Sequence, residues 1–84
     1  MKFSAEIIVM PHKELLDPQG KAVLNGLTNL GLKNVEDIRI GKHILMKLDA
    51  SSRNEAMSIA KTASQKLLAN QVMEEFNITI EEDQ

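Results

Sequence analysis

The sequence contains no cysteine, tryptophan or tyrosine, and phenylalanine occurs only twice, as Phe3 and Phe76. Without cysteine, the chain cannot form disulfides, bind a metal through thiolates or use a thiol nucleophile. An open sheet that binds RNA needs exposed aromatic side chains on which bases stack. Both phenylalanines share the parity of positions expected in the core, so the sequence argues against an RNA-binding sheet as well.

A strong charge of one sign and long apolar runs are also missing. The net charge is −2 and the pI is near 5.6, whereas nucleic-acid-binding domains usually carry a basic surface. The longest apolar run, Ile7–Met10, is far shorter than the roughly 20 residues of a membrane-spanning helix. No apolar leader segment is recognisable. We therefore expect a cytoplasmic protein that binds neither nucleic acid nor membrane.

What the sequence does contain is the balance of a small globular domain. It has 84 residues, of which 43% are hydrophobic and 26% are charged. A chain of this length forms one domain, which we expect to span residues 1–84. Such a domain buries only about 60–65% of the surface that its unfolded chain exposes, so its intrinsic stability is modest.

Hydrophobic periodicity divides the chain into alternating strands and helices. Apolar residues at every second position predict strands over residues 2–10, 34–49 and 76–80. Apolar residues three and four positions apart predict helices over residues 18–30 and 53–69. The element order is therefore β-α-β-(β)-α-β, and the acidic end that follows the last strand is expected to fray.

The strand region 34–49 allows two arrangements, because five of its apolar residues, Ile38, Ile40, Ile44, Met46 and Leu48, have even numbers. One long strand would place them on a single face. A hairpin with the three-residue turn Gly41-Lys42-His43 would do the same, since it pairs Ile40 with Ile44. The sequence leaves both open.

Both predicted helices have recognisable ends. Asp17 can accept a hydrogen bond from the first helical turn, and Pro18 fits the first helical position. The residues Ser52–Glu55 match a capping box. Gly31 is expected to end the first helix, and Asn70 to end the second in a left-handed conformation.

This order predicts an α+β, ferredoxin-like sandwich, in which two helices cover one face of an antiparallel sheet. The helix residues expected to face the sheet are Val23, Leu27 and Leu30 in the first helix and Ala56, Ile59, Ala60, Ala63 and Leu67 in the second. By parity, Ile8, Met10 and Leu45 fall on the open face of the sheet. An apolar patch there would indicate a partner or a second copy of the chain.

Two features look like chemical motifs without the residues that the chemistry needs. Gly26–Gly31 has the glycine spacing of a phosphate loop, but Leu32 and Lys33 follow where lysine and a hydroxyl residue are required. His12 and His43 have no carboxylate at metal-ligand spacing. We therefore expect no catalytic residue and no metal site in this chain.

Four short stretches of the sequence match one family in order and spacing. They are Leu16-Asp17-Pro18-Gln19-Gly20 with Ala22-Val23, Leu30-Gly31, Ile38-Arg39-Ile40-Gly41-Lys42 and Leu67-Leu68-Ala69-Asn70. Through them, residues 2–80 resemble the PurS family, the small subunits of phosphoribosylformylglycinamidine (FGAM) synthase. The resemblance implies a PurS-like version of the ferredoxin-like fold.

The resemblance also implies a function, as a non-catalytic subunit in de novo purine biosynthesis. FGAM synthase converts formylglycinamide ribonucleotide, glutamine and ATP to the amidine, glutamate, ADP and phosphate. A glutaminase subunit (PurQ) releases ammonia, and a large synthetase subunit (PurL) uses ATP and magnesium. The PurS subunit assembles the two and assists ammonia transfer. It is expected to pair with itself, and whether as a dimer or a tetramer stays open.

The matching stretches supply the candidate contact residues. The candidates for partner contact are Asp17, Pro18, Gln19, Gly20, Gly41, Lys42 and Asn70, and those for a dimer face are Ile8, Met10 and Leu45. Alternatively, the Asp17–Gly20 stretch serves only to start the first helix, and Asn70 serves only to end the second. Lys42→Glu is predicted to weaken complex formation without preventing folding.

Two other functions suit a ferredoxin-like fold. A dimeric regulatory module that binds a small molecule would share this architecture, and a ligand-induced rise in melting temperature would favour it. A small phosphatase of acyl phosphates would need an arginine and asparagine cradle near a phosphate-binding loop. Residues 11–17 contain no arginine and no glycine-rich loop, which disfavours the phosphatase.

Overall fold

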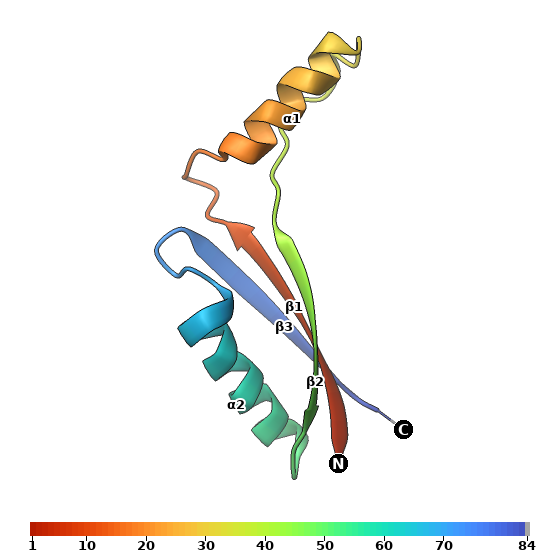
Figure 1. Ribbon diagram of the computed structural model, residues 1–84, viewed down its shortest axis with the longest axis vertical. Coiled ribbons are helices and arrows are strands. Elements are labelled where there is room, and N and C mark those ends of the chain that lie inside the picture. Colours follow the sequence, from red (N-terminus) through yellow and green to blue (C-terminus); the bar gives the residue numbers. More distant parts are fainter. Residues whose placement is uncertain (84) are drawn as a thin grey trace.

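The structure is a computed structural model that describes residues 1–83, and it combines an antiparallel sheet with two α-helices (Figure 1). In chain order the elements are β1 (Lys2–Pro11), α1 (Pro18–Asn29), β2 (Lys42–Asp49), α2 (Arg53–Ala63), the π-helix η1 (Ser64–Leu68) and β3 (Glu74–Glu82). The predicted α+β, ferredoxin-like class is confirmed.

The sheet has the strand order β2-β1-β3, and β1 pairs antiparallel with both neighbours. Ile7 lies opposite Ile44 on one side and Ile78 on the other, and Phe3 lies opposite Leu48. Since this register joins odd positions of β1 to even positions of its neighbours, the apolar residues of all three strands share one face.

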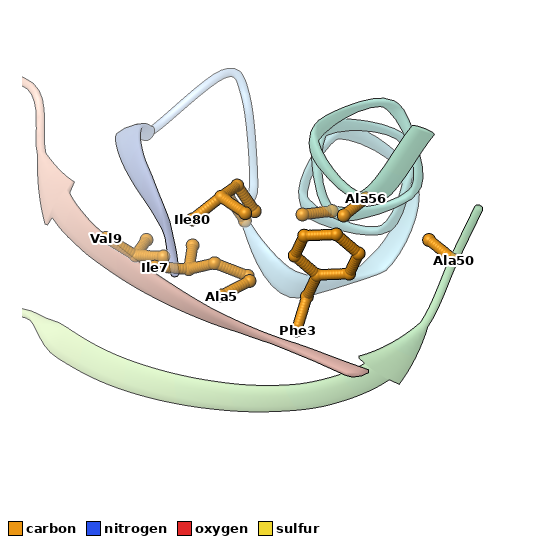
Figure 2. Close-up of a cluster of buried hydrophobic side chains, with 9 residues drawn as sticks. Phe3, Ala5, Ile7, Val9, Ala50, Ala56 and Ile80 are labelled. Atoms are coloured by element: carbon orange, nitrogen blue, oxygen red, sulfur yellow. The ribbon is translucent and has the colours of Figure 1, made fainter. Parts of the chain in front are cut away.

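The helix α2 covers this apolar face, and the core lies between them (Figure 2). The buried apolar residues are Phe3, Ala5, Ile7, Val9, Ala50, Ala56, Ala60, Ala69 and Ile80. Alanine at the helix positions lets the helix backbone approach the sheet closely, which leaves room for the ring of Phe3 beneath it.

Only the second half of the predicted strand 34–49 belongs to the sheet. β2 begins at Lys42 and is a single strand rather than half of a hairpin, and residues 35–41 have no strand pairing. At Gly41 a Cβ atom would lie 2.2 Å from the carbonyl oxygen of Val9, so the backbones touch there before the chain diverges from the sheet. The optional fourth strand is absent from residues 1–83.

The first helix does not lie on the sheet face, contrary to the prediction. α1 projects beyond the end of the sheet, joined to it by an outgoing connection, residues 12–17, and a returning connection, residues 30–41 (Figure 1). The expected contact residues remain accessible, with Val23 43% and Leu30 77% exposed. We refer to residues 12–41 as the arm.

The predicted end of the second helix is wrong in detail. After Ala63 the chain widens into the π-helix, in which the Ala69 N–H donates to the Ser64 carbonyl at 3.0 Å. Ser64 in this turn is buried on the sheet side, and Leu67 is exposed. Ile59, in the regular part of α2, is exposed as well, although both were expected in the contact face.

The two predicted helix stops differ in outcome. Gly31 adopts a positive φ of 90°, as expected at the end of α1. Asn70 does not adopt the left-handed conformation that we predicted, because no residue other than glycine among the described residues has a positive φ. Its side-chain oxygen instead accepts from the Val72 N–H at 3.1 Å and forms a turn.

The helix starts are closer to prediction. The Ser52 hydroxyl accepts from the Glu55 N–H at 3.1 Å, as in a capping box. The Glu55 carboxylate, however, accepts from the Ser51 hydroxyl rather than reaching back to the cap residue.

The acidic C-terminal end is held in place as far as Asp83, where fraying was expected. The Ser4 hydroxyl donates to the Asp83 carboxylate at 2.7 Å, and Lys47 Nζ lies 3.3 Å from the same carboxylate. The Asp83 N–H donates to the Lys2 carbonyl at 2.8 Å. The remainder of the predicted fraying, at Gln84, lies outside the described residues.

These contacts predict an acid-sensitive contribution to stability from Asp83. The hydrogen bond from Ser4 is the main cause that lowers the pKa of this carboxyl. Its stabilisation is therefore complete at neutral pH and is lost as the pH falls below about 4 and through the lowered value. Asp83→Asn should lower the free energy of unfolding at pH 7 and have little effect near pH 2. Urea unfolding at both pH values tests this, and an equal effect at both would contradict it.

Candidate functional site

The base of the arm brings together most of the residues predicted for partner contact. Asp17 caps α1, since its Oδ1 accepts from the Gly20 N–H at 3.1 Å. Its Oδ2 accepts from the Ile40 N–H at 2.7 Å. The hydrogen bond from Ile40 is the main cause that lowers the pKa of Asp17, followed by the bond from Gly20. This carboxylate is therefore charged at neutral pH and connects the two ends of the arm.

Close backbone approaches explain the two glycines in this region. A Cβ atom on Gly20 would lie 2.0 Å from the Ile38 carbonyl oxygen, so no larger residue fits there without displacing the backbone. Arg39 adds a hydrogen bond from its guanidinium to the carbonyl of Pro11, at the end of β1. Sequence reasoning gave Arg39 no role, although it lies within one of the matching stretches.

We call this set of contacts the joint of the arm. Its members are Pro11, Asp17, Gly20, Ile38, Arg39, Ile40 and Gly41. Two of the four matching stretches of sequence thus meet in space, one from each connection. Asp17, Gly20 and Gly41 therefore have a structural role at the joint. Pro18 and Gln19 lie beside the joint and are exposed.

Lys42 and Asn70 meet at a second position, at the beginning of β3. Lys42 Nζ lies 3.4 Å from the Leu68 carbonyl and 3.8 Å from the Glu74 carboxylate. The Asn70 N–H donates to the same carboxylate at 2.9 Å. His12 holds the adjacent loop, because its backbone N–H donates to the Met73 carbonyl at 2.9 Å.

These contacts refine the prediction for Lys42→Glu. A second carboxylate beside Glu74 and the terminal carbonyl groups of η1 is unfavourable, but the Lys42 side chain is 54% exposed. We expect the free energy of unfolding to fall by no more than about 1 kcal/mol. Urea unfolding of Lys42→Glu and of the neutral variant Lys42→Gln measures the charge contribution. Failure of Lys42→Glu to fold would contradict this prediction of a small loss of stability.

The candidate dimer residues lie on the open face of the sheet. Ile8 is 40% exposed and Leu45 is 60% exposed, while Met10 is half-buried. Ile8 lies between His43 and Asn77 in the neighbouring strands. Ile8 and Met10 are two positions apart on β1 and line the same hollow, and polar side chains flank Ile8 across the sheet.

A cleft of about 500 Å³ opens at the joint, on the side where the arm leaves the sheet. Its lining residues are Lys13, Leu15, Leu16, Asp17, Lys21, Leu24, Asp37, Ile38 and Arg39. Within residues 1–83, no three histidine or acidic side chains lie close enough to hold a metal ion. The described helices include none that is both long and apolar enough to cross a membrane.

Taken together, the geometry defines an α+β protein of the ferredoxin-like class whose candidate residues build a projecting helix and its attachment. The PurS family model, described as phosphoribosylformylglycinamidine (FGAM) synthase, matches residues 4–82. The PurS subunit of Bacillus subtilis is 34% identical over 80 residues, which cover 95% of this chain and 94% of the relative.

Solved structures agree with this match. A Bacillus subtilis PurS crystal structure has a TM-score of 0.88 and 34% identity, covering 95% of this chain and 99% of that one. A chain of the PurLQS structure from Thermotoga maritima has a TM-score of 0.87 and 28% identity, covering 96% and 99%. The chain belongs to the PurS family of FGAM synthase subunits. The alternative of a regulatory ligand-binding module gains no support from these comparisons.

Proposed function

We propose that this chain joins a PurL-type synthetase to a PurQ-type glutaminase and assists the transfer of ammonia between them. Membership of the PurS family carries this proposal, and the similarity to a chain of the PurLQS structure supports it. ATP and magnesium act in the large synthetase subunit, and the complex works in the cytoplasm. The chain has no cysteine and therefore cannot supply a thiol nucleophile for the glutaminase reaction.

A transfer path has a chemical purpose in such a complex. Ammonia in water at neutral pH is mostly ammonium, which lacks the lone pair that attacks the activated substrate. A path closed to water keeps ammonia in its reactive form, as water exclusion does within active sites. A subunit that orients the other two would close such a path by holding their openings together.

The proposed subunit acts as a homodimer formed through the arm. The arm carries apolar side chains that the described residues leave largely exposed, including Leu16 at 68% and Leu30 at 77% exposure. The apolar sheet face lacks the second helix of a ferredoxin-like sandwich, and Ile44, Phe76 and Ile78 are only partly buried there. An arm from a second copy would cover this part of the sheet face. In a symmetric dimer, each arm would pack on the sheet of the other copy, and the apolar surfaces of arm and sheet would both be buried.

Reconstitution with the PurL and PurQ subunits of the same organism tests the assembly function. We expect glutamine-dependent amidine formation to require this chain, and turnover driven by added ammonium salt to be independent of it. The second assay is the control that the synthetase itself is active. If glutamine-dependent turnover is unaffected by the chain, the assembly function is wrong.

Two matched double variants test the dimer. Val23→Glu/Leu30→Glu places two charges on the apolar side of α1, whereas Asn25→Glu/Asn29→Glu places the same charges on its opposite side. We expect the first pair to weaken dimerisation at least tenfold in sedimentation experiments and the second to leave it unchanged. Equal effects of the two pairs, or a monomeric parent chain, would contradict dimerisation through the arm.

A further inference from the structure

The Asp17 carboxylate links two segments that lie far apart in the sequence. One oxygen caps the first turn of α1 through the Gly20 N–H, and the other accepts from the Ile40 N–H at 2.7 Å. Ile40 lies at the end of the returning connection, two residues before β2. The second bond is therefore no part of helix capping, because it fixes the helix start to the chain that re-enters the sheet.

The arm has little else to fix its direction. α1 packs against neither the sheet nor α2 (Figure 1). Of its residues, only Gly20 is buried. The Arg39 contact with Pro11 and the close approach of Gly20 to Ile38 lie at the same point of attachment. The angle between the arm and the sheet is thus set within the joint, and Asp17 makes the only bond there that includes both the helix start and the Ile40 backbone.

We propose that Asp17 is a positioning residue that fixes the direction of the arm, and that this direction determines how tightly two copies associate. The second part rests on the proposed dimer. An arm held at one angle presents its apolar side to the second copy without the additional entropic cost of ordering the arm on docking. An arm that swings about the joint presents the same side chains but loses this preorganisation.

Substitution of Asp17 by Asn or by Ala distinguishes the effects of its two hydrogen bonds, from the Gly20 N–H and from the Ile40 N–H. Asn caps helices about as well as Asp, so Asp17→Asn keeps the bond from Gly20. Its other terminal atom is an NH₂ group, which cannot accept from the Ile40 N–H. Asp17→Ala loses both bonds. Asp37→Asn is the matched control, because it removes the same charge from the cleft at the joint without changing either Asp17 bond.

Spin labels can measure the direction of the arm, since the chain has no native cysteine. We would label Asn25→Cys in α1 and Lys61→Cys in α2 and dilute the labelled chain with unlabelled chain, so that only distances within one copy are recorded. We expect Asp17→Asn to keep the helix content but to broaden the distance distribution. We expect it to weaken dimerisation about tenfold, because a mobile arm must be ordered when it docks. We expect Asp37→Asn to change neither the distance distribution nor the dimer affinity.

Several outcomes would overturn the proposal. An unchanged distance distribution in Asp17→Asn would show that the joint holds the arm without this bond. A broadened distribution with unchanged dimer affinity would show that direction does not control association. Loss of helix content as large as in Asp17→Ala would assign Asp17 to capping alone. A monomeric parent would refute the dimer, while the distance measurement would still decide the positioning function.

Discussion

Replacing Gly20 with alanine will destabilise the protein by about 1–3 kcal/mol, although alanine is the better helix former. Gly20 lies in the first turn of α1, where an added Cβ would meet the Ile38 carbonyl oxygen at 2.0 Å and the Asp17 carboxylate at 2.8 Å. The oxygen at 2.0 Å belongs to the backbone and cannot rotate away. The returning connection must therefore move, which separates Ile38 and Ile40 from the helix start.

Gly26→Ala is the matched control within the same helix. A Cβ at Gly26 would meet nothing within 4 Å, so this substitution should stabilise α1 by about 0.5–1 kcal/mol through the lower backbone entropy of alanine. Urea unfolding followed by far-UV circular dichroism gives both values. If the two variants change stability in the same direction, the tight contact at Gly20 is not a determinant of the joint.

Truncating Phe3 to alanine should cost about 3–5 kcal/mol, the range for removing a fully buried aromatic side chain. Phe3 is 1% exposed and packs between β1 and α2, beside Ala56 (Figure 2). The small residues around it have no long side chains that could refill the space. Since domains of this size are only marginally stable, we expect Phe3→Ala to be largely unfolded at 37 °C.

Val72→Ala provides the comparison for Phe3→Ala, because Val72 is 80% exposed and its truncation should change stability by no more than about 0.5 kcal/mol. Thermal unfolding by circular dichroism measures both. A Phe3→Ala variant as stable as Val72→Ala would show that the core beneath α2 does not hold the fold together.

Local chemistry in the sequence was sufficient to predict β1, β3 and the helix starts. Alternation identified β1 and β3, and the caps at Asp17 and Ser52 lie where expected. The register of the sheet also follows from the pattern, because a shift by one residue would turn Ile7 and its neighbours towards solvent. The strands and the helix starts depend on residues that are close together in the sequence, and a sequence pattern contains such residues.

The direction of α1 could not be predicted in the same way. An apolar side on a helix indicates that something covers it, and the sequence does not say whether the cover belongs to the same chain. The alternation around Ile38 and Ile40 was interpreted as a strand. It instead reflects packing and hydrogen bonding at the joint, where Ile38 lies against Gly20.

The candidate site was predicted as a set of residues and not as an arrangement. The family resemblance selected Asp17, Gly20 and Gly41, but only the structure shows that tight backbone contacts between the two connections require them. Asn70 was assigned a left-handed stop because it follows a helix. In the structure a π-helix follows α2 instead. The sequence pattern of this π-helix does not differ from that of an ordinary last helical turn.

The strand order has a consequence for how the protein folds. The central strand β1 is made first, yet both of its neighbours come from later parts of the chain, and Phe3 pairs across to Glu82. Contacts of such long sequence separation close slowly, because chain entropy must be lost before pairing compensates for it. On the ribosome the edge of β1 that pairs with β2 can close once Asp49 has emerged, but the edge that pairs with β3 stays unpaired until almost all of the chain has been made, so completion of the sheet is delayed until synthesis is nearly finished.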